Sequence, residues 1–337
     1  MLYNKLMSKI ITHLYRGKII ESTHRVKCLI QKINGEKIYS TNNENDYIFP
    51  RSSIKVFQAI PFAYSKAIEK FQLNNKQIAL SCSSHCAEWF HAKEIESWLQ
   101  KIKIKKNKLR CGIHNPLDKK SSENLFVSGK KPNQIHNNCS GKHLGMLSAC
   151  LAEGYSTEDY LDFNHKHQRN IRNIFENFTE TKILKSNFGI DGCSAPQYAF
   201  KIKDIQNALI NLYKSFNSKF KFNSEVQLLI KSIIENPKYI GGTLNLDSNL
   251  IKISKGQIFC KGGAEGVFLF CHLTKGITGV IKIEDGNERA LKSVMYELSK
   301  KFNLLDNIQL KKFLYYGNFD ITNHAKLSIG KTKTILK

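Results

Sequence analysis

The sequence is short of several residue types, and each shortage argues against a class of protein. Of its 52 basic residues only seven are Arg, and the Lys residues are spread along the whole chain. Surfaces that bind nucleic acids concentrate positive charge on one face and use Arg for two-point contacts. The net charge of +24 therefore favours a compositional bias toward Lys, Ile and Asn over a nucleic-acid-binding surface.

Long apolar runs and a regular cysteine pattern are also missing. No segment approaches the ~20 apolar residues of a membrane span, and residues 1–17 contain no apolar core long enough for a signal peptide. Nine cysteines at irregular spacing, with no C-x-x-C pair, fit free thiols in a reducing compartment better than a disulfide framework. We therefore expect a cytoplasmic protein with no membrane partner.

The two ends of the sequence are rich in β-forming residues, and the middle is helical. Asn34-Gly35 stands between two such runs and predicts a hairpin. Apolar residues recur at helical spacing through the middle, about residues 50–236. The predicted helices run from near Ser52 to Phe71 with a kink at Pro61, and over 93–102, 141–154, 164–178, 203–216 and 224–237.

Strand patterns return after the helical middle. They cover 249–262 and 266–283, and a helix is predicted from about Asn287 to Phe302. Strands at both ends around a helical middle predict an α+β fold, in which the terminal strands build one antiparallel sheet covered by helices. No linker or repeat divides the sequence, so we expect residues 1–337 to form a single domain.

Ser52 and Lys55 form an S-x-x-K pattern at a predicted helix start, where residues three apart share a face. A neutral lysine amine can take the proton of a serine hydroxyl and make it a nucleophile. Lowering a lysine pKa from about 10.4 to near 7 requires surroundings that favour the neutral amine over the charged one by roughly 4–5 kcal/mol. Burial or a neighbouring cation can supply this free energy. The alternative is a helix N-cap followed by a solvated lysine, with Arg51 at the surface.

Two further segments carry reactive side chains among small residues. Ser84 and His85 lie in "ALSCSSHCAE", and Lys261 ends an apolar strand before Gly262-Gly263. Small residues allow a backbone to approach a ligand closely. A turn followed by a helix cap is the alternative for the first segment.

Cysteines occur in two other motifs, "HNNCSGKHLGML" and "FGIDGCSAPQYAF". Zinc favours thiolate ligands, so Cys139 and Cys193 are candidate ligands, with Lys142 or His143 adding a nitrogen. Two buried structural cysteines are the alternative.

Four motifs together resemble the asparaginase II family, the rhizobial-type L-asparaginases, in both residue type and order. They are "RSSIK", "NNCSGKH", "GIDGCSAP" and "KGGAEGVF", and the resemblance extends from "YRGKIIESTHR" through "CSSHCAE" to "GGTLNLDS". It implies a fold like the serine β-lactamases and glutaminases. It also implies hydrolysis of L-asparagine to L-aspartate and ammonia, by a homodimer.

The resemblance also implies a set of site residues. Two serine–lysine pairs would share one active site, Ser52 with Lys55 and Ser84 with Lys261. Ser52 is our first choice for the nucleophile, and Ser84 is the alternative. A zinc ion that aids substrate binding would be held by three residues, Cys139, Lys142 and Cys193. The candidates for contacts with the substrate are Arg51, His85, Asp191 and Glu265.

Three positions depart from the pattern of the family. Asn245 stands where Arg is usual, and Ala87 and Trp89 stand where Gly and Pro are common. Two alternatives to an L-asparaginase stay open. One is a related serine–lysine amidohydrolase or acyltransferase, of glutaminase or penicillin-binding type, and the other is a basic, zinc-stabilised binding protein without catalysis.

Overall fold

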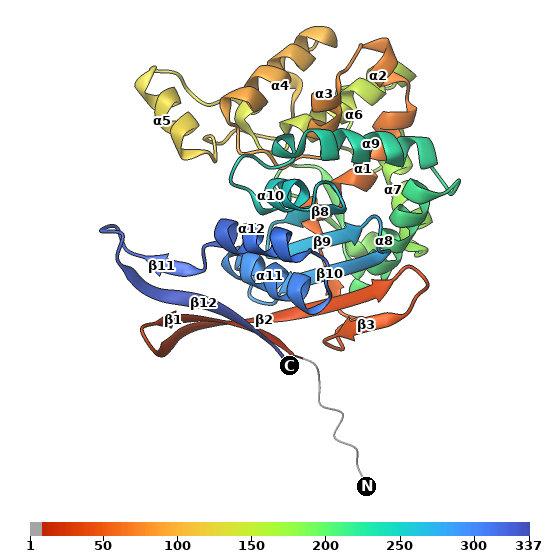
Figure 1. Ribbon diagram of the computed structural model, residues 1–337. Helices are drawn as coiled ribbons and strands as arrows, with labels where there is room; N and C mark the ends of the chain where they lie inside the picture. Colours follow the sequence, from red (N-terminus) through yellow and green to blue (C-terminus); the bar gives the residue numbers. More distant parts are fainter. Residues whose placement is uncertain (1–8) are drawn as a thin grey trace.

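Strands from both ends of the chain form one antiparallel sheet (Figure 1), in a computed structural model that describes residues 9–337. The strand order is β11-β12-β1-β2-β10-β9-β8, and β3 pairs with β2 beside this path. The predicted α+β architecture is confirmed. The strands are β1 (Ile10–Arg16), β2 (Ile19–Lys32), β3 (Lys37–Ser40), β8 (Ile258–Gly263), β9 (Val267–His272), β10 (Ile277–Ile283), β11 (Asp320–Thr322) and β12 (Ser328–Leu336).

The first strand lies between the second and the last. Ile10 is paired with Val26 of β2 on one side and with Leu336 of β12 on the other. The predicted hairpin is confirmed, because β2 and β3 pair across a turn in which Gly35 has a φ of 88°. Two small two-stranded sheets lie outside the main one, β4 (Tyr47–Ile48) with β7 (Phe200–Lys201) and β5 (Phe188–Ile190) with β6 (Pro196–Tyr198).

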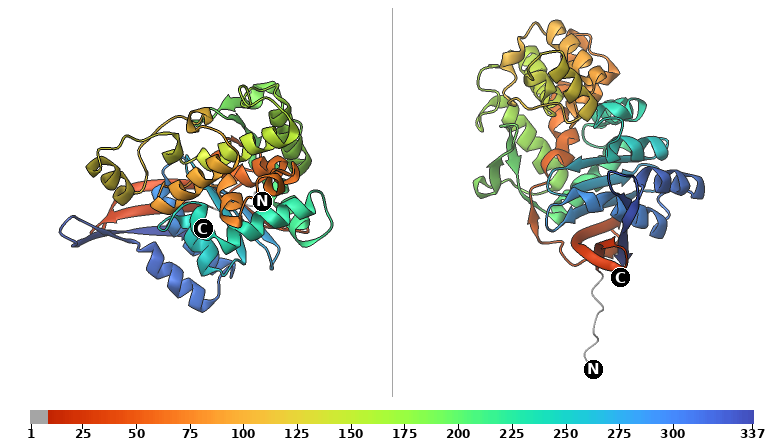
Figure 2. Two further views of the ribbon diagram at one scale, coloured as in Figure 1. Left: turned by 90° about the horizontal axis from the view of Figure 1, so that it is seen from above. Right: turned by 90° about the vertical axis from the view of Figure 1, so that its left-hand side faces the viewer.

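The helical middle of the chain forms a second part above the sheet, seen from two sides in Figures 1 and 2. The α-helices are α1 (Lys55–Tyr64), α2 (Ala67–Lys70), α3 (Asn75–Ser81), α4 (Trp89–Lys101), α5 (Lys119–Val127), α6 (Ser140–Glu153), α7 (Lys166–Thr179), α8 (Ile202–Asn217), α9 (Asn223–Glu235), α10 (Leu246–Ile253), α11 (Leu291–Lys301) and α12 (Asn307–Gly317). The 3₁₀ turns are η1 (Arg51–Ile54), η2 (Lys106–Lys108), η3 (Gln134–His136), η4 (Lys185–Asn187), η5 (Pro237–Tyr239) and η6 (Glu288–Ala290).

Helix α1 lies at the centre of the helical part. It contacts α6, α7 and α9, and every residue from Lys55 to Phe62 is buried. A helix that is buried on all sides belongs to the interior of a domain. Lysine at its first position is therefore a buried cation or a buried amine, and not a solvated helix residue.

Helices also cover the sheet. Helix α8 packs on β2, β9 and β10, and α11 packs on β1 and β12. Strands β8, β9 and β10 consist largely of buried residues, including β8 at the edge of the sheet, because α8 packs on β9 and β10 and both α10 and η1 pack on β8. Strand β8 ends beside η1, which brings two of the predicted motifs together.

The prediction for 249–262 is wrong in its first half, where the chain forms helix α10. The Asn245 side chain caps this helix by accepting a hydrogen bond from the Asp247 backbone N–H. Leu250 and Ile251 share its buried face with Asp247. Helix α12 and strand β12 were also missed, and β12 has few apolar residues because Lys and Thr alternate along it.

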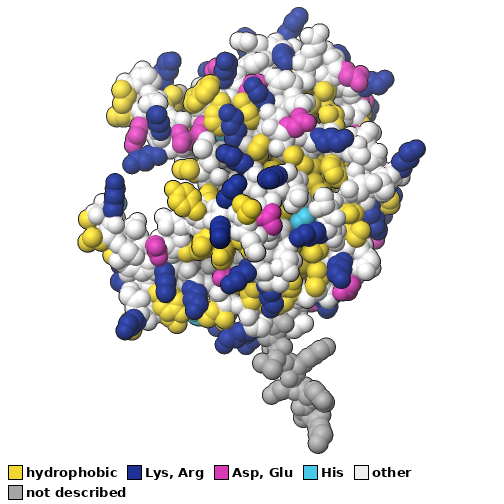
Figure 3. Space-filling view, viewed as in Figure 1, with side chains coloured by type: hydrophobic (Ala, Val, Ile, Leu, Met, Phe, Trp, Pro, Cys, Tyr) yellow, Lys and Arg dark blue, Asp and Glu magenta, His cyan; other side chains and the backbone are white. Residues whose placement is uncertain are grey.

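Positive charge is spread over the surface, as Figure 3 shows for one face, where Lys and Arg side chains are scattered among all others. On this face of the described residues the charges do not form the continuous basic stripe that is typical of nucleic-acid-binding proteins. Within residues 9–337, no helix combines the length and the hydrophobicity that crossing a membrane requires.

Candidate active site

Ser52, Ser84 and Lys261 line one pocket of about 400 Å³, which we call the serine pocket. They come from three separate segments: η1, the loop after α3, and the end of β8. The convergence of hydroxyl groups and an amine in one concave site is the arrangement that a serine–lysine hydrolase requires.

Lys55 connects the serine pocket with the buried thiols. Its side chain is completely buried, and its Nζ donates to Ser84 Oγ at 3.1 Å, to Cys139 Sγ at 3.3 Å and to the Ser83 carbonyl oxygen. The expected pairing with Ser52 is different in the structure, because the bond between these residues joins the Lys55 backbone N–H and the Ser52 carbonyl oxygen. In a 3₁₀ turn this backbone bond brings residues three apart together, and the lysine side chain is free to point into the core.

The environment of Lys55 favours its neutral form. Burial lowers its pKa, the nearby cations Lys142 and Lys261 lower it further, and only the Cys139 and Cys193 thiols act in the opposite direction. An amine with a lowered pKa, hydrogen-bonded to a serine hydroxyl, has the chemistry of a general base.

Lys261 is held in a different way. Its side chain is 2% exposed, and its Nζ donates to Asp247 Oδ2 at 2.8 Å and to the Gly262 carbonyl oxygen at 2.6 Å. Asp247 lies in the first turn of α10 and is as deeply buried. Lys261 is therefore paired with a carboxylate, whereas Lys55 contacts a hydroxyl, a carbonyl oxygen and a thiol, so the surroundings of the two lysines differ.

The close approach of β8 and η1 depends on Gly263. A Cβ atom at this position would lie 2.6 Å from the Pro50 carbonyl oxygen and 3.0 Å from the Ser53 nitrogen. Both are backbone atoms, so relief would require the turn to move. The glycine therefore sets the position of Ser52 relative to Lys261.

The three predicted zinc ligands, Cys139, Lys142 and Cys193, form a buried group that we call the thiol cluster. Lys142 Nζ donates to Cys193 Sγ at 2.9 Å. A hydrogen bond from Cys139 lowers the pKa of Cys193 against the effect of burial, and the same bond raises the pKa of Cys139 well above its ordinary value. Burial opposes the charge on Lys142, yet the two cysteines raise its pKa.

The donor set of the thiol cluster fits zinc. Two sulfur ligands suit this ion, and the imidazole of His143 adds a buried Nε2 for which no partner exists among residues 9–337. Its other nitrogen, Nδ1, is 2.7 Å from the Tyr160 hydroxyl. Burial lowers the pKa of His143 and Cys193 acts in the opposite direction, which places the imidazole near the thiol cluster.

Three predicted substrate contacts lie in a neighbouring hollow. Arg51, Asp191 and Glu265 line a pocket of about 460 Å³, which we call the arginine pocket. Arg51 Nε donates to Asp191 Oδ1 at 2.8 Å. None of the three lines the serine pocket, although Arg51 is adjacent to Ser52 in the sequence.

His85 makes no direct contact with either pocket. It is completely buried, its Nδ1 accepts a hydrogen bond from the Ala87 backbone N–H at 3.1 Å, and its Nε2 lies 2.8 Å from Ser140 Oγ. Burial lowers its pKa well below the ordinary value, so Nε2 carries the proton and donates to Ser140. Contact of His85 with the substrate stays a prediction, and in the structure the ring positions the segment that follows Ser84.

The sequence analysis missed several polar residues of the serine pocket. Burial raises the pKa of Glu288, with Asp247 as the second cause, and burial lowers the pKa of Lys292. Asp247 lies inside the quoted motif "GGTLNLDS" and could have been found there. The missed residues that line this pocket are Asn138, Asp247, Glu288 and Lys292.

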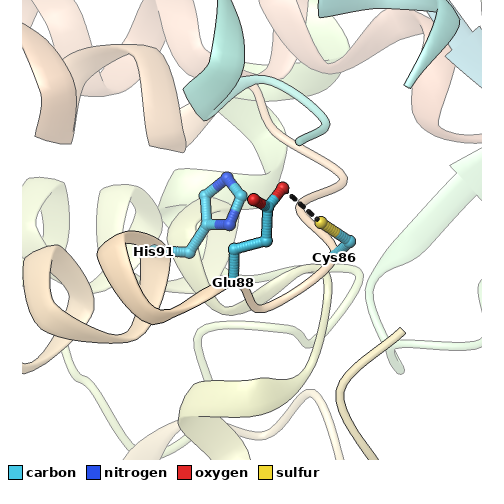
Figure 4. A group of neighbouring side chains, drawn as sticks. All are labelled: Cys86, Glu88 and His91. Atoms are coloured by element: carbon cyan, nitrogen blue, oxygen red, sulfur yellow. Dashed lines mark hydrogen bonds between the residues drawn. The ribbon is translucent and has the colours of Figure 1, made fainter. Parts of the chain in front are cut away.

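A second group that could hold a metal ion consists of Cys86, Glu88 and His91 at the start of α4 (Figure 4). It was not among the predicted sites. Cys86 and Glu88 occur in the quoted segment that contains Ser84, and His91 follows three residues after Glu88. A Cys, a Glu and a His within six residues were the available signal.

The model of the L-asparaginase II family matches residues 12–334. The protein belongs to this family, and the resemblance inferred from its motifs is confirmed.

Two individual proteins are similar to the chain. A curated protein of Vairimorpha ceranae (strain BRL01), "Probable CCR4-Not complex 3'-5'-exoribonuclease subunit Ccr4", is 25% identical over 282 residues. The match covers 76% of the chain and 55% of that protein, so the chain spans about half of its length. A solved structure of a proposed β-lactamase from Bacteroides dorei DSM 17855 aligns with a TM-score of 0.39 and 10% identity, over 87% of this chain and 94% of that one.

Proposed function

We propose that the serine pocket hydrolyses L-asparagine to L-aspartate and ammonia through a serine ester. The observation that carries this proposal is the hydrogen bond from the buried Lys55 amine to Ser84 Oγ, at the wall of a pocket that also contains Ser52 and Lys261. Amide hydrolysis requires a nucleophile, a base and a donor for the oxyanion, and these groups supply all three.

Ser84 is the nucleophile in this proposal, and Lys55 is the base. In the neutral form the lone pair of Lys55 accepts the hydrogen bond from the Ser84 hydroxyl, and Lys55 takes the proton as Ser84 Oγ attacks the side-chain amide carbon of asparagine. The protonated lysine then gives the proton to the leaving nitrogen, which departs as ammonia. Water hydrolyses the resulting ester and releases aspartate. The structure favours Ser84 over our first choice, Ser52, because the base is bonded to Ser84.

Lys261 stabilises the oxyanion. An ammonium group has three N–H donors, and two of those on Lys261 are used by Asp247 and the Gly262 carbonyl oxygen. The third is free to point into the pocket that Lys261 lines. Because Asp247 and the Gly262 carbonyl oxygen hold the Lys261 Nζ in place before the reaction begins, the donor does not have to reorganise during it.

The charged ends of the substrate fit the residues that the sequence analysis missed. Glu288 offers a carboxylate to the substrate's ammonium group, and Lys292 offers an amine to its carboxylate, both from the wall of the serine pocket. Asn245 lines the same pocket where the family usually has Arg. It caps α10 instead, and this leaves Lys292 as the cationic contact.

Zinc is the cofactor we propose for the thiol cluster. Bound there, it would supply positive charge beside the substrate and aid its binding. Lys55 is the link, since its Nζ donates both to Ser84 Oγ and to Cys139 Sγ. A change in charge at the thiol cluster therefore changes the pKa of Lys55, the proposed base.

The remaining predictions concern the protein as a whole. Strands near both ends of the chain pair in one sheet, and residues between 52 and 292 line the serine pocket, which supports the single domain proposed over 1–337. All nine cysteines are free thiols, which supports a reducing, cytoplasmic environment. The homodimer is proposed from the family resemblance.

The test is ammonia release from L-asparagine and L-glutamine by the full-length protein and its variants. Ser84→Ala and Lys55→Met should each lower kcat by at least ~10³-fold, and Ser128→Ala, at an exposed position, should leave it unchanged. An inactive Ser52→Ala with an active Ser84→Ala would overturn the assignment of the nucleophile. Turnover of glutamine or a β-lactam alone would favour the related amidohydrolase or acyltransferase. Salt-sensitive nucleic-acid binding without amidase activity would favour the binding protein.

A further inference from the structure

Cys86, Glu88 and His91 have no part in the proposed reaction, yet they are arranged as metal ligands. Their ligand atoms all lie within 4.8 Å of one another. Figure 4 shows the imidazole, the carboxylate and the sulfur facing a common point at the start of α4. A thiol, a carboxylate and an imidazole are the three side-chain types that bind zinc in proteins.

His91 provides the observation that points to a ligand. The residue is completely buried, its Nε2 lies 3.1 Å from the Lys238 carbonyl oxygen, and its Nδ1 has no partner within residues 9–337. Donation to a carbonyl fixes the proton on Nε2 and leaves a lone pair on Nδ1. Burial lowers the pKa of His91 to about 4, so the ring is neutral near pH 7. This is the second-shell arrangement that orients imidazole ligands in metal sites.

The other two ligands are already in contact. Cys86 Sγ donates to Glu88 Oε1 at 3.2 Å, and burial together with this carboxylate raises the pKa of Cys86 to about 12. A divalent cation would replace the shared proton and offset the repulsion between thiolate and carboxylate. Gly242 makes room for the sulfur, since a Cβ atom there would lie 2.2 Å from Cys86 Sγ.

We propose that Cys86, Glu88 and His91 bind a thiophilic divalent cation such as Zn²⁺, at a site separate from the thiol cluster. Three protein ligands leave one position of a tetrahedral ion for water. Cys86 and Glu88 are only half-buried, so water can reach that position. The proposal does not depend on the identity of the reaction in the serine pocket.

This site joins the two segments that form one wall of the serine pocket. Glu88 accepts hydrogen bonds from the backbone N–H of Thr243 at 2.6 Å and from its hydroxyl at 2.7 Å. Two residues before Cys86, the Ser84 backbone N–H donates to the Ile240 carbonyl oxygen at 2.9 Å. A bound cation would therefore fix the segment with the proposed nucleophile to the loop that enters α10.

The experiment is titration of the metal-free, full-length protein with Co²⁺, which absorbs strongly when a thiolate binds it. Cys139→Ala/Cys193→Ala removes both sulfurs of the thiol cluster, and this double variant should still bind about one Co²⁺ per chain with a thiolate band. Adding Cys86→Ser should abolish the band and weaken Co²⁺ binding at least ~100-fold. Cys150→Ser, a buried cysteine on α6, should leave both unchanged.

Cys86→Ser in the otherwise unchanged protein is measured in parallel, in case the multiple variants do not fold. There it should remove about one equivalent of bound Co²⁺ and the rise in Tm that this equivalent gives. If the band, the stoichiometry and the Tm are the same with and without Cys86, the proposal is wrong. Asparaginase activity is not read in this experiment, so its outcome is independent of the proposed function.

Discussion

The buried ion pair between Lys261 and Asp247 allows the sharpest prediction about the site. Both side chains are nearly inaccessible, 2% and 4% exposed, and Nζ and Oδ2 are 2.8 Å apart. Asp247→Asn keeps the shape of the side chain and removes its charge. Lys261 then either stays charged without a partner or loses its proton.

The first outcome lowers the stability of the protein, and the second lowers its kcat. Leaving one member of a buried ion pair uncompensated lowers stability by about 3–5 kcal/mol. If the amine loses its proton, the fixed positive charge beside the oxyanion is gone, and losing one such donor lowers kcat by about 10²–10³-fold. We therefore expect Asp247→Asn to be both less stable and nearly inactive.

Urea unfolding followed by circular dichroism measures the first effect, and ammonia release measures the second. The matched control is Glu36→Gln at the Lys32–Glu36 pair, which has a similar distance of 2.9 Å but side chains that are 46% and 52% exposed. It should change the free energy of unfolding by less than about 1 kcal/mol. Adding Lys261→Met to Asp247→Asn should recover stability without recovering activity. Equal effects of Asp247→Asn and Glu36→Gln would refute the reasoning.

The remaining predictions use pH and backbone contacts. Because burial lowers the pKa of Lys55 and the base must be neutral, kcat/KM should rise with pH along a limb well below the ~10.4 of a free lysine; a limb at or above that value would contradict its role. His167 and His272 have pKa values lowered by burial to about 3 and about 4, so the unfolded chain binds protons first as pH falls below ~6.5. The free energy of unfolding should therefore decrease as the pH falls to about 4, by up to about 2.7 kcal/mol per pH unit for the two groups. Urea unfolding at pH 7, 6 and 5 measures this decrease, and equal free energies at the three pH values would contradict the prediction. Gly263→Ala should lower kcat/KM about 100-fold by displacing η1. Gly192→Ala, with no atom within 4 Å of its new Cβ, should leave kcat/KM unchanged. Equal values of kcat/KM for the two variants would show that Gly263 does not set the position of η1.

The fold was largely predictable because its elements carry local signals. The Asn34-Gly35 turn and the continuous apolar run of β9 identify strands without any knowledge of their partners. Strand β12 was not predictable, because its sequence alternates Lys and Thr with few apolar residues. Its assignment depends on pairing with β1, which is a contact across the whole chain.

The sequence predicted which residues belong to the candidate site, but not which of them contact one another. The motifs identified Ser84 and Lys55, but their hydrogen bond joins two segments whose spacing carries no information about the contact. Spacing suggested the pair of Ser52 and Lys55 instead, which η1 uses for a backbone bond. His85 looked like an active-site residue because of its neighbours, and the structure shows that it is completely buried.

The pairing of β1 with β12 has a consequence for synthesis on the ribosome. Thr12 and Thr334 share a hydrogen bond although they are 322 residues apart. At about 5–20 residues per second, the first strand waits roughly 15–65 s for this neighbour. During that time β1 exposes an unpaired edge to other nascent chains. A chain that stops before residue 328 keeps that edge permanently, so truncated products are expected to aggregate although the serine pocket lies elsewhere.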